Sequence, residues 1–253
     1  MVFPRCPILS ALTVLTGLLC YGCARPLPPA SPLTYNPIDR YRFRCEPIDS
    51  VYVADHLDAL ETLFGANLHA DAYRAKLLAA LAFYPDLRDV EIHLRHRRLR
   101  TSMAARPLRL GAGPSRRRYA IYVDDITDKP NDFRNSIYAA QVGCFIHELG
   151  HIAHYEQQAN DQLVTQGLAY VTNQKFKNRY ERIADNNVLR VGGGYQLYLY
   201  RRFTFERAEL PEDYLAFKRR NYRSQDRILE LHLEYVEEIG VKACRGYGSP
   251  NAG

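Results

Sequence analysis

Apolar positions in the first half of the chain follow both helical and strand spacing. Residues 53–63 and 70–83 have the apolar spacing of helices. Residues 90–94 alternate apolar and polar side chains, and residues 118–123 form a second strand candidate. Residues 124–134 contain aspartate, proline and asparagine, which indicates a loop.

From Ile137 onward the apolar spacing is almost entirely helical. The pattern breaks at four places: near Asn160, Lys177, residues 192–194 and Pro211. No internal repeat and no strong linker follows residue 40, so residues 41–253 are expected to form one domain. A few strands followed by many helices predict an α+β fold with a small sheet and a mostly helical C-terminal half.

The first 24 residues are typical of an export signal. A single charged residue, Arg5, precedes the apolar run of residues 8–19. That run is too short to cross a bilayer, which needs roughly 20 residues. Cleavage after Ala24 would use Gly22 and Ala24 as the two small residues before the cut. The chain is therefore expected to act outside the cytoplasm.

A second processing route is lipid attachment at Cys23. Gly22 and Cys23 resemble the end of a bacterial lipobox, although Cys20 and Tyr21 replace its usual leucine and small residue. This route would give a periplasmic, outer-membrane or cell-surface lipoprotein, whereas cleavage after Ala24 would give a secreted or periplasmic protein. An uncleaved N-terminal anchor is the remaining alternative.

The segment that follows reads as a flexible tether over residues 25–40. It is rich in proline and has no apolar periodicity. Beyond it the chain keeps Cys45, Cys144 and Cys244, and an exported chain can form a disulfide, so we predict the pair Cys45–Cys244. Three cysteines cannot make a dense framework, so stability must come mainly from the core.

Composition excludes two broad classes. Of 253 residues, 47% are hydrophobic and 25% are charged, which excludes a disordered chain and a polytopic membrane protein. The net charge of +6 arises from basic residues that are dispersed along the chain. A solvated basic surface is therefore expected rather than a nucleic-acid interface, and membrane contact is expected only through Cys23.

The motif that carries chemistry is His147-Glu148-Leu149-Gly150-His151. At about 100° per residue, the two histidines stand about 40° apart on one helix face and can bind the same metal ion. Glu148 projects from nearly the same side, where it can act on a water held by the metal. The alternative is a helix with two surface histidines.

A second pair of side chains lies thirty positions downstream. Glu181 and Asp185 are one helical turn apart, on the side of their helix that carries apolar residues, so both are expected to point inward. The apolar neighbours are Ala184, Val188 and Val191. The alternative is a surface helix whose carboxylates pair with Arg182 or Arg190.

Together the two motifs resemble the gluzincin branch of the zincin metallopeptidases, over residues 119–194. The resemblance implies one Zn²⁺ per chain, held by His147, His151 and Glu181. It also implies Glu148 as the catalytic base and Asp185 as a hydrogen-bond partner of a ligand histidine. A zincin-like fold would place residues 118–123 as the edge strand beside the HExxH helix.

The longer metzincin pattern is absent from this chain. His154 stands where that pattern has glycine and Gln157 where it has its last histidine. We therefore expect His154 to be an ordinary rim or core histidine, and Cys144 to be a small buried side chain rather than a ligand.

Three protein ligands leave an open fourth position, which is typical of catalytic zinc sites. We therefore expect an exported zinc-dependent metallohydrolase, with Glu148 as general base and a peptide or protein as substrate. The alternative from another class is a non-catalytic surface or periplasmic binding protein with a structural metal site. Hydrolysis of a non-peptide amide bond is a third reading.

Overall fold

The computed structural model describes residues 36–40, 42–109, 112–114, 116–127, 129–206 and 209–238. The predicted signal, the tether as far as residue 35 and Cys244 lie outside the described residues. Export, lipid attachment at Cys23 and the Cys45–Cys244 disulfide therefore stay predictions. Within the described residues, no helix is both long enough and apolar enough to cross a membrane.

The described part of the predicted tether is packed onto the domain. Ile38 is buried, and the Asn36 side chain donates to the Ala82 carbonyl oxygen at 2.8 Å. The Tyr52 hydroxyl donates to the Pro37 carbonyl oxygen at 3.1 Å. The tether was therefore predicted to end too late, because residues 36–38 have partners that lie far away in the sequence.

The N-terminal half supplies short helices and all four strands of one sheet. The helices are α1 (Ser50–Asp55), α2 (Leu57–Phe64) and α3 (Arg74–Leu81), with 3₁₀ turns at Arg42–Arg44, Pro85–Leu87 and Phe133–Asn135. The strands are β1 (Leu68–His69), β2 (Glu91–His96), β3 (Met103–Pro107) and β4 (Arg118–Val123). Their order is β1-β2-β4-β3, with β1, β2 and β4 parallel and β3 antiparallel to β4.

Two helices predicted in this half have different bounds. The helix predicted over residues 53–63 is split at His56, whose ring nitrogen Nδ1 lies 2.8 Å from the Tyr52 carbonyl oxygen while its backbone N–H donates to Val53. The helix predicted over residues 70–83 begins only at Arg74. It starts late because the preceding Tyr73 has a φ of 58°, in the left-handed region.

The predicted edge strand is wrong. Residues 118–123 form β4, which has β2 on one side and β3 on the other. β4 is buried almost throughout, as expected of an interior strand, whereas β3 lies at the edge of the sheet next to it. Sequence spacing missed β3, because Met-Ala-Ala-Arg-Pro has neither β-branched residues nor clear alternation.

The C-terminal half is helical, as predicted. It contains α4 (Tyr138–Glu156), α5 (Asn160–Thr172), α6 (Gln174–Arg190), α7 (Gly194–Phe205), α8 (Glu212–Asn221) and α9 (Gln225–Glu238). The breaks expected near Asn160, residues 192–194 and Pro211 are present. The break near Lys177 is not, because α6 starts earlier, where the Asn173 side chain accepts from the Phe176 N–H at 3.1 Å.

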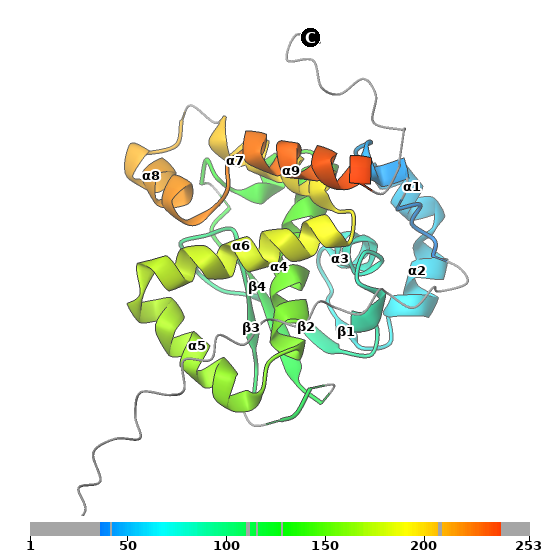
Figure 1. Ribbon diagram of the computed structural model, residues 1–253. Coiled ribbons are helices and arrows are strands. Elements are labelled where there is room, and N and C mark those ends of the chain that lie inside the picture. Colours follow the sequence, from blue (N-terminus) through cyan, green and yellow to red (C-terminus); the bar gives the residue numbers. More distant parts are fainter. Residues whose placement is uncertain are drawn as a thin grey trace, which may run out of the picture.

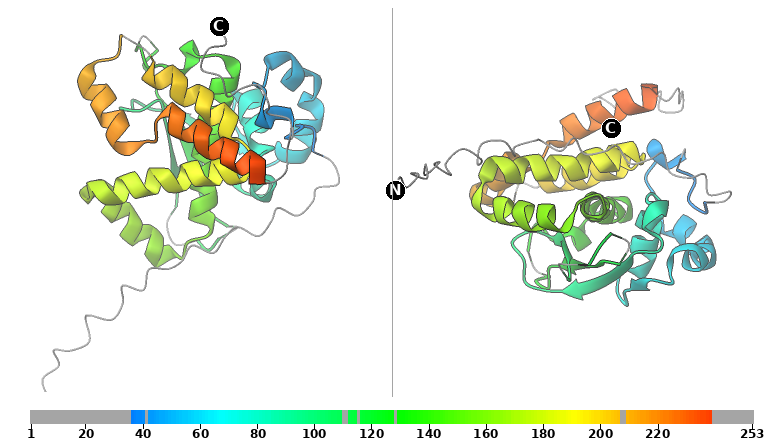
Figure 2. Two further views of the ribbon diagram at one scale, coloured as in Figure 1. Left: turned by 45° about the horizontal axis from the view of Figure 1, so that its top comes forward. Right: turned by 60° about the horizontal axis from the view of Figure 1, so that its bottom comes forward.

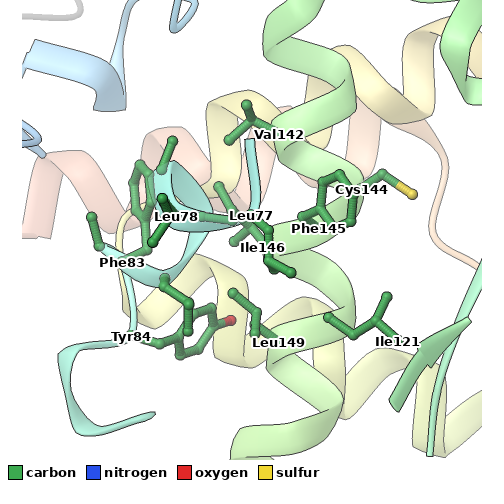
Figure 3. Close-up of a cluster of buried hydrophobic side chains, with 14 of the residues drawn as sticks. Leu77, Leu78, Phe83, Tyr84, Ile121, Val142, Cys144, Phe145, Ile146 and Leu149 are labelled. Carbon is green, nitrogen blue, oxygen red and sulfur yellow. The ribbon is translucent and has the colours of Figure 1, made fainter. Parts of the chain in front are cut away.

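These elements make an α+β fold layered around α4. Figures 1 and 2 show the sheet on one side of α4, with α6 and α7 on the other side and α9 beyond α7. The apolar side of α4 contacts α3 and β4, as Leu77, Ile121 and Phe145 show in Figure 3. Enclosure from several directions explains why α4 is buried over most of its length.

A glycine allows α6 to approach α4 closely. A Cβ atom at Gly150 would lie 2.8 Å from the Ala184 carbonyl oxygen and 3.2 Å from the Tyr84 hydroxyl. The same contact is fixed by the Asn187 side chain, which donates to the Gly150 carbonyl oxygen at 2.9 Å. The glycine inside the HExxH motif thus sets the distance between the two helices that carry the candidate site.

Gly150→Ala is expected to lower the free energy of unfolding by about 1–3 kcal/mol, because the added methyl group must push α6 away from α4. Gly167→Ala on α5 is the matched control, since nothing lies within 4 Å of its Cβ position. Removing a helical glycine there should stabilise the protein by about 0.5–1 kcal/mol. Urea unfolding measures both; an unchanged Gly150→Ala protein would contradict the close approach.

Candidate metal centre

Three donor groups from two helices converge in the interior. His147 and His151 lie one turn apart on α4, and Glu181 reaches them from α6. The Glu181 Oε2 atom lies 3.3 Å from His147 Nε2 and 3.2 Å from His151 Nε2. All three residues are buried, and their ligand atoms lie within 4.8 Å of one another.

The spacing of these donors fits a zinc ion. Two ligand atoms in a tetrahedral zinc site, each about 2.0–2.2 Å from the metal, lie about 3.3–3.6 Å apart. The contact of Glu181 Oε2 with His147 lies at the lower limit of that range, at 3.3 Å, and the contact with His151 lies just below it, at 3.2 Å. Two imidazole nitrogens and one carboxylate oxygen are also the donor types that zinc prefers. The three residues can therefore hold a divalent metal together.

Asp185 contacts the far side of one of the histidines. Its Oδ1 atom lies 3.1 Å from His147 Nδ1, which leaves Nε2 facing Glu181. Burial lowers the pKa of His147, but contacts with Asp185 and Glu181 outweigh burial and raise that pKa to about 9. A carboxylate behind an imidazole fixes its tautomer and orientation, which is the position expected for Asp185 from the motif resemblance.

The negative charge of Asp185 is balanced by arginines. Arg201 Nη2 of α7 lies 2.9 Å from Asp185 Oδ1, and Arg223 Nη1 lies 3.6 Å from Oδ2. Burial raises the pKa of Asp185, whereas Arg201 and His147 lower it, to about 2 overall. The alternative of a surface helix paired with Arg182 or Arg190 is wrong, because Asp185 is 0% exposed.

The second carboxylate oxygen of Glu181 is held by α5, a helix that lies outside both sequence motifs. The Tyr170 hydroxyl of α5 donates to Glu181 Oε1 at 2.6 Å. Burial raises the pKa of Glu181, but the charge of His151 and the contacts with His147 hold it well below the usual range. The Oε2 atom of this carboxylate thus stays directed at both imidazoles.

Glu148 lies beside the donors without belonging to their group. Its Oε2 atom accepts a hydrogen bond from the Ala105 N–H of β3 at 2.6 Å. The Ala105 carbonyl oxygen accepts a hydrogen bond from the Tyr155 hydroxyl at 3.1 Å. The outer edge of β3 is therefore held against α4, with the carboxylate fixed between strand and helix.

A cleft of about 560 Å³ opens onto this centre. Glu148, His151 and Glu181 line it, β3 forms one wall, and α5, α6 and Phe217 of α8 form the others. A volume of this size is typical of ligand pockets. The candidate base and two of the three donors are thus at the surface of one cavity.

The other residues singled out from the sequence lie outside the donor group. His154 is buried, and burial lowers its pKa to about 4, as expected of a core histidine. Cys144 is a buried free thiol whose pKa burial raises to about 12. Both expectations of burial are confirmed.

Sequence patterns missed several residues that build the site. Arg201, Tyr170 and the backbone of Ala105 all contact it from elements that no motif connects to HExxH. Their roles depend on how α5, α7 and β3 pack around α4, and no spacing in the sequence reports that packing.

A second group of donors lies on the sheet. His69 and His93 stack at 4.4 Å, and Glu91 Oε1 lies 2.7 Å from His93 Nε2. This group is exposed at His69, and the other Glu91 oxygen pairs with Arg118 at 2.8 Å. A cation would have to compete with that arginine, so the group serves below as a control for metal binding.

Comparisons with known proteins return no match to this chain, whether with family models, with curated proteins or with solved structures.

Proposed function

We propose that this protein is an exported zinc-dependent hydrolase that cleaves peptide bonds, and that its fold is zincin-like. The observation that carries the proposal is the buried convergence of His147, His151 and Glu181 at a cleft that also exposes Glu148. A metal site that served only stability would have no use for a further carboxylate beside the donors.

The three donor residues would hold the metal, which when bound would polarise the substrate carbonyl and acidify a water molecule. Glu148 would accept the proton of the attacking water and then deliver it to the leaving amine nitrogen. The Ala105 N–H supports this role because it fixes one oxygen of the carboxylate. Asp185 would keep His147 Nε2 directed at the metal.

The edge strand supports a peptide as the substrate. β3 pairs with β4 along one side only and borders the cleft with the other. An extended peptide can bind alongside such an edge through main-chain hydrogen bonds, here at positions of β3 other than Ala105, whose N–H and carbonyl groups already bond Glu148 and Tyr155. The zincin-like part of the proposal is this placement of an edge strand beside the HExxH helix, with β3 in the position first predicted for residues 118–123.

Metal content tests the proposal directly. The mature chain, stripped with a chelator and dialysed against zinc, is expected to retain one zinc per chain. His147→Ala and Glu181→Gln should each lose it, because two donors remain. His93→Ala, which disrupts the exposed group on the sheet, is the control and should keep one zinc.

Equal zinc in wild type and His147→Ala would contradict the ligand assignment. Full zinc together with no cleavage across a randomised peptide library would instead favour the alternative of a binding protein with a structural metal. The two parts of the proposal, metal binding and hydrolysis, are thus tested separately.

A further inference from the structure

The cleft is lined by cations from three different parts of the chain. Arg100 precedes β3, Arg106 lies on β3 and Lys177 lies on α6, and all three line the same cavity as Glu148 and Glu181. Among the described residues, none of the three cations has a carboxylate oxygen within 4.0 Å. None of the three cations therefore forms an ion pair with a described residue.

Two of these cations are held against one aromatic ring. The Arg100 guanidinium carbon lies 4.4 Å from the centroid of Phe217, and the Lys177 ammonium lies 4.9 Å from it. Lys177 also lies 5.2 Å from the centroid of Tyr170. Ring faces attract both charges, so Phe217 keeps two like charges close together despite their repulsion.

The two carboxylates of the cleft form no ion pair with these cations. Glu148 and Glu181 are the acidic residues that line it, and both are already bonded, to the Ala105 N–H and to the Tyr170 hydroxyl and imidazoles. Lys177 is half-buried, and burial lowers its pKa; the charge of Glu181 opposes this shift, whereas the charges of Arg100 and Arg106 add to it. Arg100 and Arg106 are exposed and Lys177 is half-buried, so a carboxylate that enters the cleft would meet two guanidinium groups and one ammonium group, with which it can form charge-assisted hydrogen bonds.

The position of Lys177 on α6 relates the cations to the metal donors. Lys177 and Glu181 are four residues apart on α6, so they share a helix face with a rise of about 6 Å between them. An extended peptide advances about 3.3 Å per residue. A substrate carboxylate beside Lys177 would thus belong to a residue one or two positions from the bond to be cleaved.

We propose that the cleft selects substrates that carry a carboxylate within one or two residues of the cleaved bond, bound by Arg100, Arg106 and Lys177. This inference rests on the proposed function. The carboxylate can be an aspartate or glutamate side chain or the free C-terminus of a peptide, since both present the same group to the cations.

Binding to an inactive protein separates this inference from catalysis. The probes are randomised decapeptide pools with either glutamate or glutamine fixed at one central position, and pools that end in either a free acid or an amide. Zinc-loaded Glu148→Gln protein is expected to bind the preferred acidic pool about tenfold more tightly than its neutral counterpart. The glutamate and free-acid arms show which source of carboxylate the cleft accepts.

Variants of the cations show whether the cleft causes the preference. Lys177→Gln, added to the Glu148→Gln protein, should remove most of the tenfold preference. Lys175→Gln is the matched control, because Lys175 lies exposed on the same helix outside the cleft. Higher ionic strength should weaken acidic binding in the control and change it less in Lys177→Gln.

Each outcome decides one of the two proposals. Equal binding of acidic and neutral pools, no binding of any pool, or tighter binding of a single-stranded oligonucleotide would overturn the carboxylate inference. Wild type that cleaves neutral peptides as fast as acidic ones would overturn it as well and leave the hydrolase proposal intact. If acidic peptides bind in a way that depends on Lys177 but the zinc-loaded wild type cleaves no peptide, the carboxylate subsite would be supported and the hydrolase proposal overturned.

Discussion

Glu148→Gln is expected to reduce turnover by about 10²–10⁴-fold while zinc content stays at the wild-type level. Glutamine has nearly the same shape as glutamate, and its side-chain oxygen can still accept the Ala105 N–H that the carboxylate accepts now. The amide cannot take a proton from water. The loss should therefore appear in kcat, with little change in unfolding free energy.

The control for this prediction lies on the same helix. Glu156→Gln makes the same substitution on α4, at a residue that accepts from the Tyr119 hydroxyl and does not line the cleft. It should keep wild-type turnover. Peptide cleavage by Glu148→Gln at the wild-type rate, with zinc bound in both proteins, would eliminate Glu148 as the base.

Arg201→Met is expected to lower the free energy of unfolding by about 3–5 kcal/mol, the usual cost of removing one partner of a buried ion pair. Arg201 is 1% exposed and Asp185 is 0% exposed, so water cannot replace the guanidinium. Methionine keeps much of the aliphatic length but leaves the carboxylate with Arg223 at 3.6 Å and His147. Zinc affinity should fall too, since Asp185 orients His147.

Arg202→Met is the matched control, one residue along α7. Arg202 pairs with Glu206 at 2.9 Å on the surface, with about half of each side chain exposed. Exposed pairs of this kind contribute about 0–1 kcal/mol. Urea unfolding of both variants, and of Arg201→Met combined with Asp185→Asn, measures the difference. Similar losses for Arg201→Met and Arg202→Met would refute the importance of the buried pair.

Sequence spacing was sufficient to predict which side chains lie together where those side chains belong to one helix. His147 and His151 share a face because four residues make about one helical turn, and that relation holds in any fold that keeps the helix. The same argument directed Glu181 and Asp185 inward, and both are buried. The helical C-terminal half follows for the same reason, since its amphipathic pattern and its glycine and proline breaks are local.

The predicted ends of the helices were less accurate, because single side-chain contacts decide where a helix begins and stops. The break at His56 depends on one ring nitrogen near the Tyr52 carbonyl, and the start of α6 depends on the Asn173 cap rather than on Lys177. Periodicity averages over such single contacts, so it predicts the existence of a helix better than its ends.

Tertiary structure alone decided which strand lies at the edge, which groups support the donors and where the cations gather. β3 has no strand signature, yet it borders the cleft because β4 pairs on both sides and leaves β3 outermost. Arg201, Tyr170 and Lys177 come from three helices that meet α4 or the cleft only after folding. The physical reason is the sequence distance between the residues in contact. Helical spacing determines neighbours within one turn, whereas contacts between elements depend on tertiary packing, which no local pattern records.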